Sequence, residues 1–156
     1  MKRRWKPVVG YENSYKVSND GMVKSTINGK VLKQIDSHGY RFVNLRKQGK
    51  TRCVAVHRLV CTTFNGKPED ESMQVDHLNM LRSDNRPENL EWVTAQENQR
   101  RKVAAKKGIR GIADDGSIVI LPNLMSADIH GFDSSLVMRC MARGLPYLGY
   151  MWESIG

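Results

Sequence analysis

The sequence lacks several features that would define its class. It holds only three cysteines, Cys53, Cys61 and Cys140, which form no CxxC pair and leave an odd thiol under any disulfide scheme. Neither a zinc ribbon nor a secreted disulfide scaffold is therefore supported. No apolar run approaches the roughly 18 residues of a membrane span, and no apolar stretch follows the basic residues at the start. We expect a cytosolic protein with no membrane contact.

Acidic residues are scarce in the first 65 positions, which hold 14 Lys and Arg against 3 Asp and Glu. Residues 66–100 reverse this balance with 8 acidic residues against 4 basic ones, and residues 101–156 hold 7 basic against 5 acidic. From a net charge of +9 alone, a surface kept basic for solubility and a nucleic-acid-binding surface are both open. The acidic island favours binding, because a divalent cation at a phosphate needs local carboxylates with phosphate-neutralising groups around them.

The first part of the chain, residues 1–55, predicts a small antiparallel sheet. Apolar residues alternate around the turn Asn19-Asp20-Gly21, and further alternating runs break at Gly39 and Gly49. Basic residues stand among the apolar ones, so one face of the sheet could lie against a phosphate backbone while the other packs. The basic positions are Lys16, Lys24, Lys33, Arg41, Arg46 and Arg52.

A second module, residues 56–107, is expected to begin with a helix. Val56, Leu59, Val60 and Phe64 fall on one helical face, and the sequence NGKP ends the helix. His57 at its start is interpreted as a packing or capping histidine rather than a ligand.

A polar cluster follows this helix. MQVDH and LEWV predict two strands joined by a polar loop, and Thr94 with Glu97 has the spacing of a capping box. If the hairpin packs on the capped helix, Asp76 and Asn98 can converge on one cation while His77 faces the other side of a bound phosphate. A neutral imidazole can then take a proton from water. An Asp-His pair that merely serves a surface turn is the alternative.

The last part of the chain, residues 108–156, predicts a hairpin and two short helices. Gly108 and Gly111 indicate a linker, and the hairpin turns at Asp115-Gly116. The two helical segments, LMSADIHG and DSSLVMRCMARG, suit a helix-turn-helix closed by Gly144. Two packed helices without a DNA role remain the alternative. The inward positions would be Leu136, Val137, Cys140 and Met141, and the outward ones Ser135, Met138, Arg139 and Arg143.

These stretches resemble a known family over nearly the whole chain. VDHLNMLRSDNRPENLEWVTAQEN (residues 75–98) is similar to the HNH nuclease motif, a ββα-metal finger, and in particular to the HNH homing endonucleases of phages. VHRLVCTTF resembles the helix that precedes the motif, and WKPVVGYENSYKVSNDGMVKS resembles the family's N-terminal module. Residues 109–154 are similar to the helix-turn-helix repeat that often closes such chains.

The resemblance implies an α+β fold and a role for each motif residue. Asp76 and Asn98 would bind one divalent cation, Mg²⁺ or Mn²⁺, His77 would be the general base, and Asn89 would hold the loop that orients it. Asn98 stands where many HNH nucleases have a histidine, and a neutral oxygen ligand suits a hard cation. Met80 in the loop, with Leu81 beside it, departs from the family's usual small polar residues.

The sequence therefore predicts a phage-type endonuclease in the host-cell cytoplasm that acts as a monomer on double-stranded DNA. It should leave 5′-phosphate and 3′-hydroxyl ends and, with one Asp-His pair, nick one strand. A DNA-binding regulator that keeps the scaffold without cutting is the main alternative, and a nuclease of the phage packaging machinery is a third. The expected DNA contacts are Lys24, Lys33, Arg41, Arg46, Arg52, Arg100, Arg101, Ser135, Arg139 and Arg143.

Overall fold

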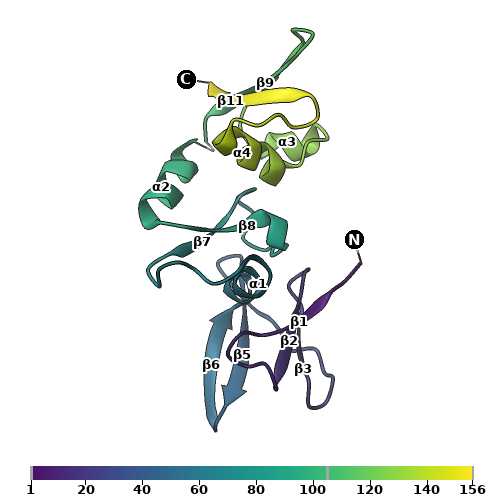
Figure 1. The fold of residues 1–156 in the computed structure, drawn as a ribbon, viewed down its shortest axis with the longest axis vertical. Helices are drawn as coiled ribbons and strands as arrows, with labels where there is room; N and C mark the ends of the chain where they lie inside the picture. Colours follow the sequence, from purple (N-terminus) through teal and green to yellow (C-terminus); the bar gives the residue numbers. More distant parts are fainter. Residues whose placement is uncertain (1, 105, 156) are drawn as a thin grey trace. The chain divides into compact units, whose positions relative to one another are not determined.

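The structure is a computed structural model that describes residues 2–104 and 106–155. It confirms the α+β class, with small sheets and short helices (Figure 1). The chain packs into two compact units. The first unit runs from the N-terminus to His77 and continues from Leu81 to Trp92; the second holds Leu78–Met80 and the chain from Val93 onward. Within the described residues, no helix has the length and apolar character needed to cross a membrane.

The first unit contains two three-stranded antiparallel sheets where the alternating sequence predicted one. One has the order β1-β2-β3 and the other β4-β5-β6. The strands are β1 (Trp5–Pro7), β2 (Tyr15–Ser18), β3 (Val23–Ser25), β4 (Ile35–Ser37), β5 (Tyr40–Lys47) and β6 (Lys50–Ala55). The turn between β5 and β6 is a two-residue hairpin in which Gln48 and Gly49 have φ values of 49° and 75°, as the tightest hairpins require.

The two sheets share one core with the helix that follows them. α1 (Val56–Val60) continues into a π-helical turn, Cys61–Asn65, and the chain then turns at Gly66. Val56, Leu59 and Val60 are buried and Phe64 packs against the same core, so the predicted apolar face is confirmed. The core also takes in valines from β2, β3 and β5 and Leu90 from β8 (Leu90–Val93). The N-terminal sheets and the strand of the polar cluster are thus one packed body.

The second unit begins on a capped helix, as the sequence predicts. α2 (Ala95–Ala104) starts after Thr94, whose Oγ1 accepts a hydrogen bond from the Glu97 backbone N–H at 3.1 Å. The Glu97 carboxylate binds Arg101 at 3.1 Å, in the i,i+4 arrangement that supports an exposed helix. Asn98, one turn into the helix, is 6% exposed.

The rest of the second unit is a three-stranded sheet with two helices, and the sequence predicted only part of it. The hairpin of β9 (Gly108–Ala113) and β10 (Ile118–Leu121) turns at Gly116 as expected. The expected linker is wrong, because its two glycines lie inside β9. A Cβ at Gly111 would come within 3.1 Å of the Trp152 ring, so glycine permits that contact. Trp152 belongs to β11 (Tyr150–Ile155), which pairs with β9 and was not predicted as a strand.

The two predicted helices are present as α3 (Ser126–Ile129) and α4 (Ser134–Arg143). α4 ends at Gly144, whose φ of 62° gives the left-handed cap that the sequence indicated. Two of the outward assignments are wrong, because Ser135 is 0% and Met138 is 8% exposed. The Ser135 side chain and backbone N–H donate to Asp133, the N-cap of α4, and Met138 joins the core of the unit. Ser135 is therefore buried against the N-cap residue and does not present a surface to DNA.

Candidate functional site

The polar cluster begins at the end of β7 (Gln74–His77), which forms a two-stranded sheet with β8. Asp76 is half-buried, whereas the His77 side chain is 6% exposed. His77 Nε2 lies 3.3 Å from Oδ1 of Asn85. Since an amide oxygen only accepts, this contact favours the tautomer with its proton on Nε2 and leaves the lone pair on Nδ1. Asn85 therefore fixes the orientation of the His77 ring.

The loop that carries Asn85 is fixed from within the first unit. Asn89, fully buried in a short 3-10 turn (Pro87–Asn89), donates from Nδ2 to the Asp84 carbonyl at 2.8 Å. This contact is in keeping with the role that the family resemblance implies for Asn89. Asn65, at the end of the π-helical turn, donates to the carbonyls of Pro87 and Leu90 at 2.8 and 2.7 Å. These contacts hold the segment from Asp84 to Leu90, which presents Asn85 to His77.

The turn between β2 and β3 supports the same loop. Gly21 in this turn is buried at φ 83°, and a Cβ there would stand 3.0 Å from Asn85 Cβ and 3.4 Å from Val56. Gln34 holds the turn by donating to the Gly21 carbonyl at 2.7 Å. The N-terminal module thus packs on the residue that orients His77.

Aromatic rings surround the His77 imidazole. The His57 ring centroid lies 5.3 Å from it in an edge-on arrangement, and Tyr40 lies 5.9 Å away. Tyr40 also contacts His57 at 5.2 Å, and the Arg82 guanidinium lies 4.9 Å from the Tyr40 ring centroid. The N-cap of α1 is Ala55 without a side-chain hydrogen bond, so of the two roles expected for His57 it has the packing role.

Burial sets the protonation of both histidines. It lowers the pKa of His77 below its ordinary value, against the opposing hydrogen bond to Asn85 and the charge of Asp76. Burial also lowers the pKa of His57 to about 4, helped by the charges of His77 and Arg58. Both imidazoles are therefore neutral near pH 7, the state in which His77 can accept a proton.

The donors available for a cation are oxygens. Across residues 2–104 and 106–155 no three His, Cys, Asp or Glu side chains gather as a metal site. The set expected from the sequence, one carboxylate from Asp76 and one amide oxygen from Asn98, fits a hard cation that keeps water and phosphate ligands, as Mg²⁺ does. Asp76 belongs to the first unit and Asn98 to the second.

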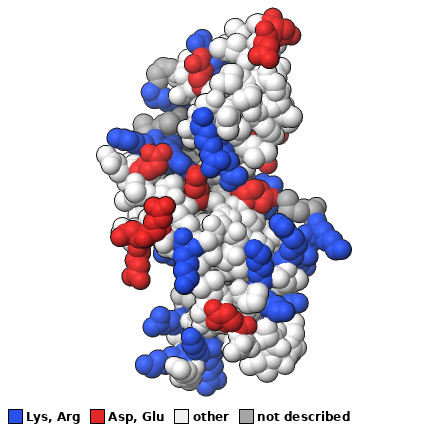
Figure 2. All heavy atoms as spheres, viewed as in Figure 1, with Lys and Arg blue, Asp and Glu red and all other residues white. Residues whose placement is uncertain are grey.

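The expected DNA contacts differ in how available their charges are. Lys33, Arg46, Arg52, Arg100 and Arg143 are exposed. Arg41 pairs with Asp36 at 3.1 Å, Arg101 pairs with Glu97, and Lys24 Nζ lies 4.2 Å from the Trp5 ring centroid. Arg139 is partly buried. Lys and Arg side chains gather at the bottom of the view in Figure 2, over the end of the β5–β6 hairpin.

Sequence reasoning missed Asn85, Gly21 and Tyr40. The offset of eight residues between His77 and Asn85 has no helical or strand period, so periodicity could not link them. Met80 and Leu81, the residues that depart from the family pattern, differ in environment. Met80 packs against the core of the second unit, while Leu81 is 44% exposed.

Comparison with known proteins places the chain in a family. A family model described as HNH endonuclease matches residues 54–100, and one described as NUMOD4 motif matches residues 4–46. A solved structure entitled "DNA binding and cleavage by the HNH homing endonuclease I-HmuI" is 31% identical with a TM-score of 0.56. The match covers 97% of this chain and 98% of that one. The chain belongs to the HNH homing endonuclease family, which confirms the resemblance seen in the sequence.

Two curated phage relatives match over a shorter range. The DNA endonuclease I-HmuI of Bacillus phage SP01 is 43% identical over 95 residues, which is 60% of this chain and 54% of that protein. The H-N-H endonuclease F-TflII of Escherichia phage T5 is 34% identical over 96 residues, 60% of this chain and 49% of that protein. The chain spans about half the length of these two relatives.

The contact between Gly21 and Asn85 predicts a stability loss that a matched glycine does not share. Gly21→Ala should cost about 1–3 kcal/mol more than Gly29→Ala, because crowding of a packed site adds to the cost of a positive φ. Gly29 has φ 68° and a Cβ there would have nothing within 4 Å, so it isolates the φ cost. Urea unfolding of both variants measures the difference. Equal losses would mean that the turn does not support the loop.

The lowered pKa of His57 predicts acid sensitivity. In the unfolded chain His57 takes up a proton near pH 6.5, whereas in the folded chain it does so only near pH 4. The contribution of neutral His57 to the free energy of unfolding is therefore fully present above pH 6.5 and falls as the pH drops from 6.5 to 4. His57→Phe keeps an aromatic ring and removes the group that takes up the proton. The change loses no hydrogen bond at Nδ1, because the buried Nδ1 of His57 has no hydrogen-bond partner within the described chain. The thermal midpoint of this variant should fall less between pH 6.5 and 4 than that of the wild type. An identical fall in both proteins would contradict the assignment.

Proposed function

We propose that this chain is a metal-dependent DNA endonuclease that hydrolyses one phosphodiester of double-stranded DNA at a recognised site. The observation that carries the proposal is the buried, neutral His77 at the end of β7, next to Asp76 and held through Nε2 by Asn85. Membership of the HNH family supports the same conclusion. DNA is proposed as the substrate because a relative is named as a DNA endonuclease.

His77 acts as the general base in this proposal. Its Nδ1 takes a proton from a water molecule, the water oxygen forms a bond to phosphorus, and the bond from phosphorus to the 3′ oxygen breaks. The leaving 3′ oxygen takes a proton from solvent water, so the products are a 5′ phosphate and a 3′ hydroxyl. Asn89 and Asn85 are positioning residues, because they act on the loop and on the imidazole rather than on the substrate.

One divalent cation, Mg²⁺ or Mn²⁺, would be held by Asp76 and Asn98 with phosphate and water oxygens. When bound, it would neutralise the charge that develops on the phosphate and on the leaving 3′ oxygen. The pairing of these two residues rests on their order in the motif and on their oxygen donors, since the two side chains lie in different units.

The flanking elements would bind the duplex. Phosphate contacts from exposed basic residues on the first unit and on α2 and α4 would supply affinity and register. A chain with unlike modules suits an asymmetric site bound by a monomer. Ser135 is not among the proposed DNA contacts, which are Lys24, Lys33, Arg41, Arg46, Arg52, Arg100, Arg101, Arg139 and Arg143.

His77→Ala should separate cleavage from binding. Cleavage should fall by about 10² or more, the scale of a lost general base, while the dissociation constant for DNA changes only a few fold. Gel-shift titration and plasmid cleavage in Mg²⁺ measure the two effects. Asp76→Ala should behave in the same way, with partial recovery in excess Mn²⁺. A wild-type chain that binds DNA in every divalent ion without cutting would instead be a DNA-binding regulator.

The single Asp-His pair predicts that one molecule nicks one strand. Supercoiled plasmid carrying the target, treated with limiting protein and Mg²⁺, should accumulate as open circles well before linear DNA appears. One chain offers one base, so a second cut needs a second binding event or a dimer. Linear product that forms directly, at a rate rising with the square of protein concentration, would show that the protein cuts as a dimer.

A further inference from the structure

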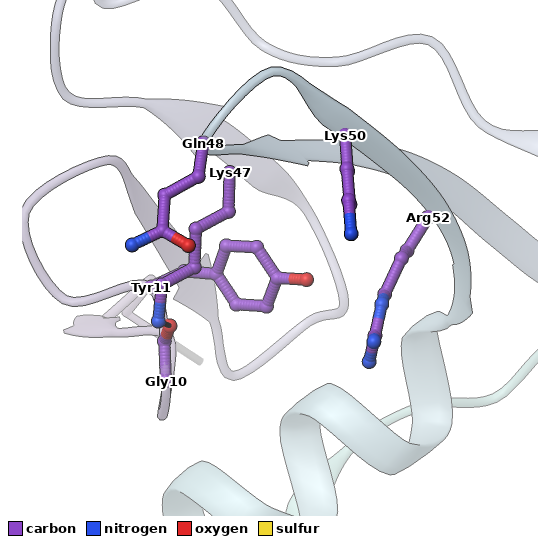
Figure 3. A pocket seen from close by; sticks show the side chains of 6 residues that line it. All are labelled: Gly10, Tyr11, Lys47, Gln48, Lys50 and Arg52. Carbon is purple, nitrogen blue, oxygen red and sulfur yellow. Dashed lines mark hydrogen bonds between the residues drawn. The ribbon is translucent and has the colours of Figure 1, made fainter.

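The first unit contains a cavity of about 410 Å³ that the proposed nuclease chemistry does not use. It lies between the end of the β5–β6 hairpin and the segment after β1, and Gly10, Tyr11, Lys47, Gln48, Lys50 and Arg52 line it (Figure 3). Three of its six lining residues are cationic, and none is acidic.

The cations stand on the inner face of the hairpin. Lys47 pairs directly with Lys50, and Leu45 pairs with Arg52, so all four residues share one face of the sheet. Leu45 on that face is fully buried in the core. Basic residues kept only for solubility would lie on the opposite face of the sheet. Here the three cations lie on the same face as Leu45, with Arg52 opposite it and Lys47 and Lys50 nearer the end of the hairpin.

This arrangement places like charges opposite each other. Directly opposed like charges across two strands are destabilising, and an anion between them would relieve the repulsion. Lys47 is partly compensated, since its Nζ donates to the Gly10 carbonyl at 2.8 Å and lies 5.6 Å from the Tyr11 ring centroid. The side chains of Lys50 and Arg52 make no hydrogen bond or ion pair within the described chain.

Tyr11 contributes a hydroxyl to the same space. Its ring is half-buried and held edge-on against Tyr15 at 6.0 Å. Figure 3 shows its hydroxyl pointing toward the side of the cavity where Lys50 and Arg52 end. Within the described residues this hydroxyl makes no hydrogen bond. The neighbouring carboxylate, Glu12, is engaged by the Gly10 backbone N–H at 2.6 Å.

We propose that this cavity holds one phosphate of the DNA backbone, away from the scissile bond. Lys50 and Arg52 neutralise its charge, and the Tyr11 hydroxyl donates to one of its oxygens. The groups that face the cavity, an ammonium, a guanidinium and a hydroxyl, are the donors that proteins commonly direct at DNA phosphates. The inference rests on the proposed function for its ligand, since the phosphate is that of the DNA substrate.

The test is the salt dependence of binding to a 40-bp DNA duplex of arbitrary sequence. The duplex has 5′-hydroxyl ends, so that all its phosphates are backbone phosphodiesters and none is a terminal phosphate. Loss of one phosphate contact lowers the slope of log Kobs against log [KCl] by about 0.9 in magnitude. The Lys50→Gln/Arg52→Gln double variant should show this loss. Tyr11→Phe should weaken binding by about five-fold, the scale of one hydrogen bond, with the slope unchanged because a neutral hydroxyl releases no counterion.

A coupling measurement identifies the cavity as the site. The Tyr11→Phe effect should vanish in the Lys50→Gln/Arg52→Gln background, because the phosphate is no longer held there. It should persist in Arg46→Gln, the matched control, since Arg46 is an exposed cation on the opposite face of β5. Thermal unfolding of each variant checks folding, and Tyr11→Phe loses no hydrogen bond that the structure describes.

Two results would overturn the inference. One is a double variant that keeps the wild-type slope, and the other is a Tyr11→Phe cost that is equal in all backgrounds. Plasmid cleavage by the wild type in Mg²⁺ is measured in parallel. Cleavage by the wild type together with an unchanged slope in the double variant would contradict the phosphate site alone. Binding by the wild type without cleavage would contradict the proposed nuclease activity alone. A wild-type chain that does not bind the duplex would contradict both the phosphate site and the proposed function.

Discussion

The hydrogen bond between His77 and Asn85 is the contact on which the candidate site depends. A buried imidazole can rotate or change tautomer unless its second nitrogen is held, and Asn85 holds it at 3.3 Å. Asn85 has no regular secondary structure to place it. Its position follows from Asn89, which binds the neighbouring Asp84 carbonyl, and from the β2–β3 turn, where Gly21 leaves room for it. Elements from three separate parts of the chain thus determine the orientation of one ring.

The sequence predicted the elements of this site well, because each carries a local signal. The segments MQVDH and LEWV on either side of a polar loop gave β7 and β8, and Thr94 marked the start of α2. The apolar spacing of Val56, Leu59 and Val60 gave the buried face of α1. The role of Asn89 came from the family resemblance, and its hydrogen bond to the Asp84 carbonyl fits that role. Local signals of this kind survive in a single sequence because they involve neighbours within one turn or one strand.

What the sequence did not reveal depends on contacts between distant residues. Gly21 reads as an ordinary turn glycine until Asn85, 64 positions later, is found against it. Ser135 reads as an exposed helical residue, but the Asp133 cap turns its hydroxyl inward. β11 has weak alternation and is recognisable only through its pairing with β9. Likewise Lys47, Lys50 and Arg52 are exposed charges, and only the register of β5 with β6 shows that they share the sheet face of the buried Leu45.

The same contacts explain why the N-terminal sheets and the β7–β8 hairpin form one unit. A two-stranded sheet such as β7–β8 is marginally stable in water by itself, and this one acquires its stability from outside. Leu90 and Val75 pack into the core built by the N-terminal sheets, and Asn65 binds the carbonyls on both sides of Asn89. Trp92 donates a hydrogen bond to the Gly66 carbonyl at 2.9 Å, and the Arg58 guanidinium lies over the Trp92 ring. Because the β7–β8 hairpin has no core of its own, the module that would bind DNA phosphates also holds His77 in place. Changes in that module will therefore reach His77 through packing rather than through DNA.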